Sequence, residues 1–164
     1  VGTVTGKTIE IINTDAEGRL ALADAIGYVK KFKPKGIIDI ATLTGACPVA
    51  LGNEAIAMMG NSVEMMDTLK SIGDELYERV WQMPLYDEYL EYIKSDVADL
   101  KNSGGKTGSL VTSGYFLKEF AGDTPWVHLD IAGTAWTEKD KPYTPKGATG
   151  TGVRLLTTFI KGMK

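Results

Sequence analysis

The 164-residue chain has a formal net charge of −3, a pI of about 5.2 and 43% hydrophobic residues. This composition is typical of a globular chain that can bury a core, and it excludes an intrinsically disordered protein. The acidic balance offers no positive field to nucleic acid or anionic lipid, and no run approaches the ~18–20 apolar residues of a membrane span. The single cysteine, Cys47, excludes an internal disulfide and fits a reducing compartment. It has no Cys or His neighbour at metal-ligand spacing, so we interpret it as a small apolar residue.

Apolar residues follow two alternating patterns along the chain. Short β-branched or continuous apolar runs indicate strands, and longer stretches with apolar residues three and four apart indicate helices. Prolines and glycines mark the ends of several of these stretches. In chain order, the patterns predict a strand at 7–12, a helix at 20–32, strands at 36–43 and 55–60, a helix from 61 with a break in 71–77, a short helix at 87–94, a helix at 111–120, a strand at 126–132, a loop at 137–151 and a C-terminal helix built on Val153, Leu156, Phe159 and Ile160.

Two carboxylates and a guanidinium, on Asp15, Glu17 and Arg19, follow the first predicted strand at alternate positions. Side chains two apart on an extended segment point to the same face, so these groups should converge. Carboxylate oxygens suit hard or borderline divalent ions and can bridge a metal pair held roughly 3.5–4 Å apart. The alternative is a solvated or N-capping pair of acids at a helix start. Because ligands gather outside the carboxyl ends of strands in open α/β sheets, Asp15, Thr42 and Gly45 should share one rim.

The octapeptide NTDAEGRL at 13–20, followed by ALADA, resembles the signature of the leucyl aminopeptidase family. Members of that family are dinuclear cytosolic enzymes that remove N-terminal residues from peptides. The resemblance covers nearly all of the chain, because four further blocks occur in family order. These blocks are ATLTGA at 41–46, WQMPL at 81–85, ADLKN at 98–102 and HLDIAGTAW at 128–136.

The resemblance implies a role for each residue of the acidic motif. Asp15 would be a metal ligand, and Glu17 would bridge two divalent ions. The ions would be Mn or Zn, with Mg and Co as alternatives, because the same oxygen set accepts all four. Arg19 would be the catalytic residue that holds an anion, proposed to be bicarbonate acting as base, beside the attacked carbonyl.

The resemblance also implies a peptide substrate site. Thr42, Leu43 and Gly45 would line it, with backbone groups of Thr42 and Leu43 holding the peptide. Ala132 and Ala135 would border the pocket for the first side chain.

The sequence also departs from the family pattern. It lacks the family's upstream metal motif, the catalytic lysine beyond it and a third metal-binding aspartate. Residues 93–97 resemble the segment around that aspartate, but they lie on the wrong side of the signature and lack the following glycines, so we interpret them as a surface helix. We therefore expect residues 1–164 to be the C-terminal portion of a dinuclear metalloaminopeptidase catalytic domain, as a single domain.

This interpretation predicts an α/β fold with a mainly parallel or mixed sheet flanked by helices and truncated at its N-terminal side. The truncation should expose a sheet edge or a helix-covering surface, which would favour self-association. We expect metal-dependent hydrolysis of leucine-type N-terminal residues by a cytoplasmic, homohexameric full-length enzyme, with the isolated chain inactive. The alternatives are a non-catalytic assembly or binding module of the same fold and an unrelated α/β domain with a chance octapeptide. Some family members bind DNA, but the acidic pI and the lack of a basic stripe argue against nucleic acid here.

Three further features have competing interpretations. His128, the only histidine, could be a general base or a metal ligand, but its apolar neighbours favour a structural or interface role. Asp130, on the same strand, is expected to hydrogen-bond locally near the rim, and we do not assign it to the metals. The glycine-rich stretch at 102–109 is either an ordinary flexible loop or, as the family implies, a loop near the active site. It is not a phosphate-binding loop, because Leu100 stands where that motif requires glycine.

Overall fold

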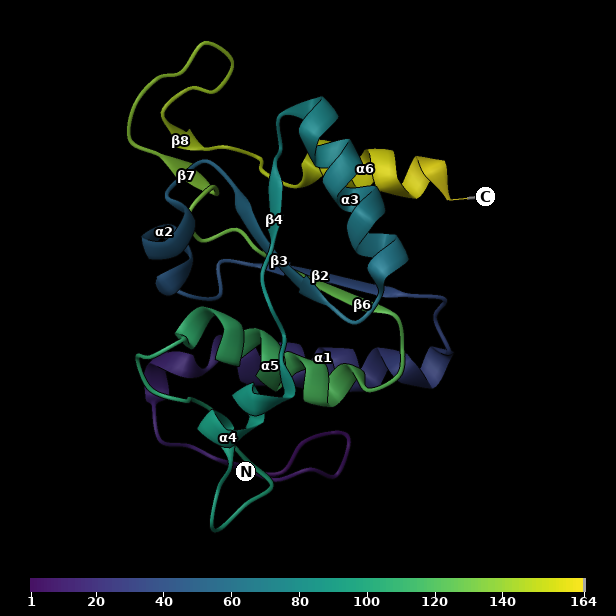
Figure 1. The fold of residues 1–164 in the computed structure, drawn as a ribbon, viewed down its shortest axis with the longest axis vertical. Coiled ribbons are helices and arrows are strands. Elements are labelled where there is room, and N and C mark those ends of the chain that lie inside the picture. Colours follow the sequence, from purple (N-terminus) through teal and green to yellow (C-terminus); the bar gives the residue numbers. More distant parts are fainter. Residues whose placement is uncertain (164) are drawn as a thin grey trace.

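The computed structural model describes residues 1–163 and places a four-stranded mixed sheet at the centre of the molecule (Figure 1). Its strands are β2 (Ile37–Ala41), β3 (Ile56–Gly60), β4 (Val80–Gln82) and β6 (Trp126–Asp130). The strand order is β2-β6-β3-β4, in which β2 runs parallel to β6, β6 antiparallel to β3, and β3 parallel to β4. The sheet is therefore mixed, and β2 lies at one edge of it.

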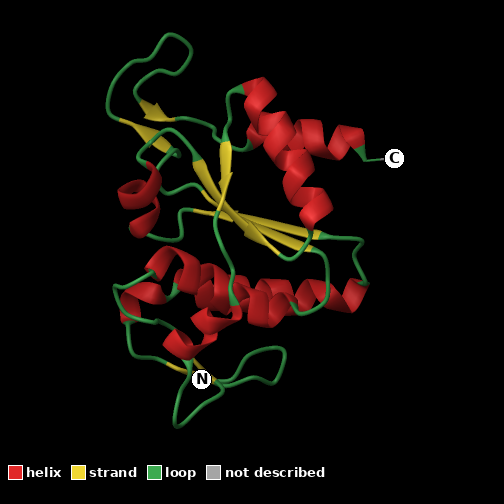
Figure 2. Ribbon diagram, viewed as in Figure 1, coloured by secondary structure: helices red, strands yellow, loops and turns green. Residues whose placement is uncertain are grey.

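Two pairs of helices cover the two faces of this sheet, as Figure 2 shows. One pair is α1 (Gly18–Val29) and α5 (Ser109–Ala121), and the other is α3 (Val63–Leu76) and α6 (Val153–Gly162). Alternate residues of β6 serve the two layers, because side chains along a strand point to opposite faces. Trp126 packs in the α1–α5 layer, and Leu129 in the α3–α6 layer. The predicted α/β class with a mixed sheet flanked by helices is confirmed.

The remaining elements are short and lie around this framework. Strand β1 pairs in parallel with β5, and β7 pairs antiparallel with β8. Among residues 1–163, no helix combines the length and the apolar character that crossing a membrane would need. The short elements are β1 (Ile9–Glu10), η1 (Thr14–Ala16), η2 (Lys30–Phe32), α2 (Ala46–Leu51), η3 (Asp87–Tyr89), α4 (Leu90–Ile93), β5 (Leu100–Lys101), β7 (Trp136–Thr137) and β8 (Gly147–Ala148).

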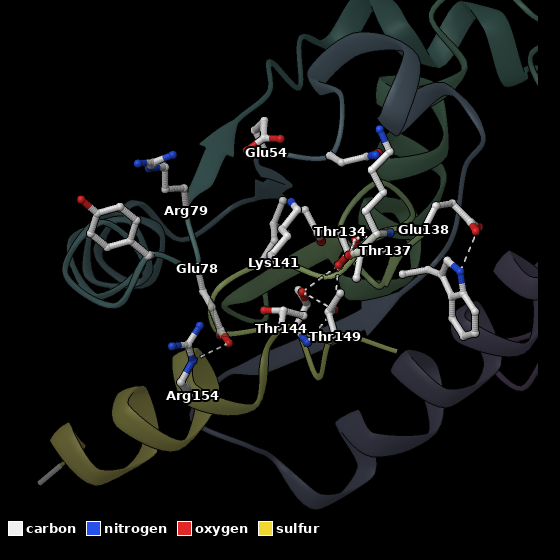
Figure 3. Close-up of a pocket in the computed structure, with 16 residues that line it drawn as sticks. Glu54, Glu78, Arg79, Thr134, Thr137, Glu138, Lys141, Thr144, Thr149 and Arg154 are labelled. Atoms are coloured by element: carbon white, nitrogen blue, oxygen red, sulfur yellow. Dashed lines mark hydrogen bonds and ion pairs between the residues drawn. The ribbon is translucent and has the colours of Figure 1, made fainter. Parts of the chain in front are cut away.

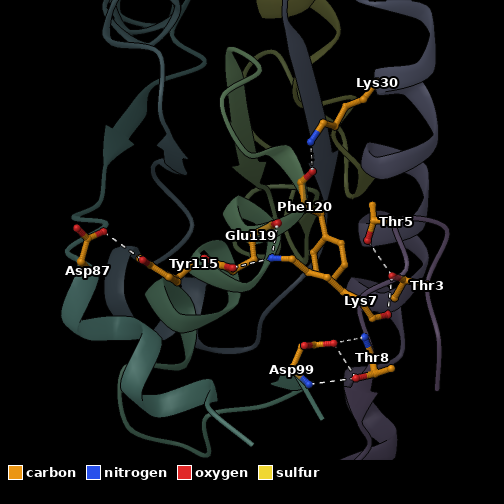
Figure 4. Close-up of polar contacts among 10 residues, drawn as sticks. All are labelled: Thr3, Thr5, Lys7, Thr8, Lys30, Asp87, Asp99, Tyr115, Glu119 and Phe120. Atoms are coloured by element: carbon orange, nitrogen blue, oxygen red, sulfur yellow. Dashed lines mark hydrogen bonds and ion pairs between the residues drawn. The ribbon is translucent and has the colours of Figure 1, made fainter.

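Polar contacts fasten the N-terminal segment to the body of the molecule (Figure 4). The carboxylate of Asp99 accepts hydrogen bonds from the Thr8 amide and the Thr8 hydroxyl, both at 2.7 Å. The Lys7 ammonium donates to the Glu119 carboxylate at 2.7 Å and to the Glu119 carbonyl at 2.9 Å, on α5. These contacts fix the segment that leads directly into the acidic motif.

The first predicted strand is much shorter than its apolar run. Only Ile9–Glu10 pair with another strand, whereas the prediction extended over 7–12. Beyond Glu10 the partner is a side chain, because the Ile12 amide donates to Asn102 Oδ1 at 3.0 Å. The backbone therefore leaves the extended ladder before it reaches the acidic motif.

The predicted break at 71–77 is wrong, because α3 continues to Leu76. Gly73 lies inside this helix and is buried. A Cβ built on Gly73 would lie 2.7 Å from the Glu78 carbonyl oxygen, so the glycine permits close packing of the following segment. Here a glycine that looked like a helix break serves a tertiary contact.

The predicted apolar face of the C-terminal helix is also partly wrong. Phe159 is buried as expected, and Leu156 is partly buried against the same core. Val153 and Ile160, however, are 65% and 64% exposed, and Leu155 is fully buried in their place. The buried face of α6 is thus rotated from the predicted one towards Leu155.

Candidate active site

The acidic motif lies in a short turn that leads into α1. The Asp15 amide donates to the side chain of Asn13 at 3.0 Å, and residues Thr14–Ala16 form the 3₁₀ turn η1. Glu17 then occupies the N-cap position of α1, but its side chain makes no capping hydrogen bond. The expected extended geometry is therefore replaced by a turn, and both the Asp15 and Glu17 side chains are exposed. Two uncommitted carboxylates at a surface turn can act as ligands for a cation.

Arg19, in the first turn of α1, is only 7% exposed. Its Nη1 donates to the Asn102 carbonyl at 2.8 Å, and its Nε has no hydrogen-bond partner within residues 1–163. Burial lowers the pKa of the Arg19 guanidinium, while the negative charges of Asp130 and Glu17 oppose that shift. Since an arginine keeps its proton in proteins, the group is a buried cation with an unused donor. Such a group is suited to holding an anion.

One pocket of about 580 Å³ brings the acidic motif and the end of β2 together. It is lined by Asp15, Glu17 and Arg19 from one segment and by Thr42 and Leu43 from the other. The two segments are adjacent because α1 packs over the sheet beside the carboxyl end of β2. Five of the residues predicted for the site therefore converge.

Gly45, Ala132 and Ala135 are not among the residues that line this pocket. Gly45 is exposed at the N-cap of α2, and Ala132 packs against the buried cluster around Cys47. The Ala135 amide donates to the Ile131 carbonyl at 2.9 Å in the turn that follows β6. Their substrate roles stay predictions.

Asn102 is a site residue that the sequence reasoning missed. Its Oδ1 accepts from the Ile12 and Asn13 amides at 3.0 and 3.3 Å, and its Nδ2 donates to the Asn13 carbonyl at 2.6 Å. Asn102 is only 1% exposed, so its own end of these partly buried bonds is shielded from water. Asn102 thereby fixes the loop that carries Asp15. Little in the sequence indicates this role: Asn102 begins the glycine-rich stretch, but it lies about 90 residues from the loop that it holds.

Asp130, at the end of β6, makes long-range contacts that the sequence did not predict. Its carboxylate is fully buried and accepts from the Leu43 amide at 3.1 Å, the Thr44 amide at 3.1 Å and the Thr44 hydroxyl at 2.7 Å. The Ala132 amide donates to the same carboxylate at 3.1 Å. The expectation of local hydrogen bonds near the rim is confirmed, and the bonds also reach the segment after β2.

His128 lies inside the sheet and is fully buried. Its Nδ1 is 2.6 Å from Asp39 Oδ1, and the other oxygen of Asp39 accepts from the Trp126 indole at 2.6 Å. The surroundings agree with the structural interpretation of His128. Within residues 1–163, no group of three or more His, Cys, Asp or Glu residues is arranged to hold a metal ion.

Cys47 is fully buried in α2, in agreement with its interpretation as a packing residue. Its Sγ donates to the Asp130 carbonyl at 3.4 Å. Burial raises the pKa of the Cys47 thiol, and the nearby charge of Asp130 raises it further. The thiol is therefore a poor nucleophile in the folded chain.

A second pocket, of about 510 Å³, lies where β7 and β8 meet the start of α6 (Figure 3). Glu78 is its buried acid, and it accepts from the Arg154 Nε at 3.1 Å, as Figure 3 shows. It also accepts from the Leu155 amide at 2.9 Å. Glu78 thus neutralises the N-terminal end of α6. The predicted site residues do not line this pocket, and its charges of both signs largely compensate one another.

The fold and the pocket define a class: an α/β domain that presents two carboxylates and a buried arginine beside the end of a sheet strand. Residues 1–157 match the model of the cytosol aminopeptidase family, catalytic domain. The chain is 58% identical over 161 residues to a probable cytosol aminopeptidase of Geobacter sp. (strain M21). These residues cover 98% of the chain and 33% of that protein. It is 56% identical over 164 residues to the one of Geotalea uraniireducens (strain Rf4), covering all of the chain and 33% of that protein.

A more distant relative is the probable cytosol aminopeptidase of Cenarchaeum symbiosum (strain A), which is 53% identical over 163 residues, or 96% of the chain and 33% of that protein. The chain therefore belongs to the cytosol aminopeptidase family, as its motifs predicted. It spans about a third of the length of these relatives.

Proposed function

We propose that this chain is the C-terminal portion of the catalytic domain of a metal-dependent aminopeptidase that removes leucine-type N-terminal residues from peptides. The observation that carries the proposal is the pocket that gathers Asp15, Glu17, Arg19 and the backbone at Thr42 and Leu43. Family membership and the names of the relatives support it.

The residues present fit part of a dinuclear metal site. Asp15 and Glu17 offer carboxylate oxygens, which are suitable donors for Mn, Zn, Mg or Co. Both side chains are exposed, and within residues 1–163 neither makes a hydrogen bond that would have to be broken. Because residues 1–163 hold no group of three such ligands, the proposal requires further ligands from the rest of a full-length protein. Bound metal ions would supply an activated water and would polarise the scissile carbonyl.

The chain's own residues would divide the remaining work. Asp15 and Glu17 would hold the ions, with Glu17 shared between them. Arg19 would hold an anion, proposed to be bicarbonate, through its unused Nε donor, and its positive charge would stabilise negative charge that develops at the reacting carbonyl. Backbone groups of Thr42 and Leu43 would orient the peptide.

The test is metal-dependent release of leucine from leucinamide by the full-length protein with Mn²⁺ or Zn²⁺. Glu17→Ala should abolish activity and lower the bound metal measured by elemental analysis, whereas Glu75→Ala, at an exposed position of α3, should change neither. The isolated chain should be inactive with either metal. Full activity in Glu17→Ala would refute the assignment, and activity in the isolated chain would refute the need for outside ligands.

The second candidate is a non-catalytic assembly or binding module. The lack of a three-ligand group within residues 1–163 favours it. It predicts that the full-length protein assembles but releases no leucine with any of the four metals. We also propose that the full-length protein is cytoplasmic and forms a homohexamer. Light scattering would test the oligomeric state.

A further inference from the structure

The backbone that follows β2 is held by one buried side chain. The last backbone bond between β2 and the segment after β6 runs from the Ile131 amide to the Ala41 carbonyl at 2.9 Å. After this point, the amides of Leu43 and Thr44 both donate to the carboxylate of Asp130. A side chain thus takes over where the strand ladder stops.

This carboxylate has a full set of donors. It accepts from Leu43, from Thr44 twice and from Ala132, and it is completely buried. Bonds between N–H groups and a buried carboxylate are stronger and more directional than bonds between neutral groups. The conformation of the turn is therefore strongly determined.

Peptide geometry connects these amides to the pocket. In a planar trans peptide, the N–H of one residue points opposite to the C=O of the residue before it. When the amides of Leu43 and Thr44 point at Asp130, the carbonyls of Thr42 and Leu43 must point away from it. Neither carbonyl accepts a hydrogen bond within residues 1–163, and both residues line the pocket of about 580 Å³.

We infer that Asp130 is a positioning residue that directs the carbonyls of Thr42 and Leu43 towards the N–H groups of a bound peptide. The inference rests on the proposed aminopeptidase function.

The test is Asp130→Asn in the full-length protein, which keeps the size of the side chain. The asparagine side chain can accept from only some of the four donors that surround Asp130. Its NH₂ group would face the Thr44 amide, which is also a donor. With one or two hydrogen bonds of about 1 kcal/mol each at stake, KM for a leucyl peptide should rise ~5- to 30-fold. The bound metal should stay at the wild-type level, and kcat should fall by less than KM rises.

Asp39→Asn is the matched control. Asp39 is also a buried aspartate, on the neighbouring strand, but it bonds His128 and Trp126 and does not contact the turn. Its KM should stay within about twofold of wild type. A second pair of variants tests a single hydrogen bond, from the Thr44 hydroxyl to Asp130. Thr44→Val removes this donor and should raise KM about two- to fivefold, whereas Thr44→Ser keeps the donor and should leave KM unchanged.

Hydrogen–deuterium exchange of the peptide that covers residues 42–45 adds a readout that does not depend on turnover. Exchange should be faster in Asp130→Asn and unchanged in Asp39→Asn. An active wild type whose KM is equally raised by both variants, or by neither, would overturn the inference and leave the proposed function intact. An inactive full-length wild type would overturn the proposed function and, with it, this inference.

Discussion

The two walls of the pocket are built differently. The acidic loop, residues 13–17, is fixed by the neutral amide of Asn102, and its two carboxylates remain exposed and uncommitted. The turn after β2, residues 42–45, is fixed by the buried charge of Asp130, which uses all its acceptor capacity within the chain. The amides of the turn are thus satisfied within the chain, whereas the two carboxylates of the loop belong to no three-ligand metal group within residues 1–163.

The proposed function accounts for this difference. A wall that binds a cation needs carboxylates that are not already neutralised, so the groups that hold it should be neutral. A wall that presents backbone carbonyls needs its amides occupied, and a buried anion does this well. The predictions below test this division of roles, starting with the largest expected effect.

After Glu17→Ala, which should abolish activity, Arg19→Ala should cause the largest loss of turnover. Removing the only buried guanidinium at the pocket should lower kcat of the full-length protein ~10²- to 10³-fold, as expected for loss of a group that stabilises developing charge. Bound metal should remain near the wild-type level, because the carboxylates are untouched. Arg19→Lys keeps the charge but not the planar fork, so it should restore only part of the rate. Loss of metal in Arg19→Ala would mean that the arginine supports the acidic loop instead.

Asn102→Ala should have the next largest effect. It removes the acceptor of two partly buried hydrogen bonds from the Ile12 and Asn13 amides, which should lower the free energy of unfolding by about 1–2 kcal/mol. Urea unfolding measures this, with the exposed Asn53→Ala as control. The acidic loop should also loosen, so Mn²⁺ affinity of the full-length protein should fall while KM changes less. A change in KM alone would contradict the division between the two walls.

The residues of the two walls show where sequence reasoning succeeds and where it fails. The convergence of Asp15, Glu17 and Arg19 in one pocket could be predicted because a family motif is local and unbroken. Strands β2, β3 and β6 could be predicted because buried strands leave continuous apolar runs. Asn102 and Asp130 could not be predicted in their roles, because their partners lie 83 to 90 residues away and leave no periodic signal. The predicted helix break around Gly73 was wrong for the same reason. Gly73 permits a close contact with Glu78 that only the folded chain reveals.

Cys47 can report on the turn after β2. Its buried thiol, with a raised pKa and a bond to the Asp130 carbonyl, should react with a disulfide reagent at least about tenfold more slowly in the folded chain than in urea. Asp130→Asn should speed the reaction, and Asn102→Ala should speed it less at equal global stability. Equal rates in both variants would mean that the two walls open together.

Substitution of Asp99 should have the smallest effect on stability. Asp99 holds Thr8, in the segment that leads into the acidic loop. Hydrogen bonds from the Thr8 amide and hydroxyl lower the pKa of the Asp99 carboxyl. A depressed folded-state pKa stabilises the fold fully above the unfolded value of about 3.9, and this stabilisation is lost as pH falls through the folded pKa. Asp99→Asn should therefore have a slightly lower Tm than wild type at pH 6. This difference in Tm should become smaller below pH 4, where wild-type Asp99 is also neutral. A Tm difference that is the same at pH 6 and below pH 4 would mean that the Thr8 contacts do not lower the pKa of Asp99 in solution.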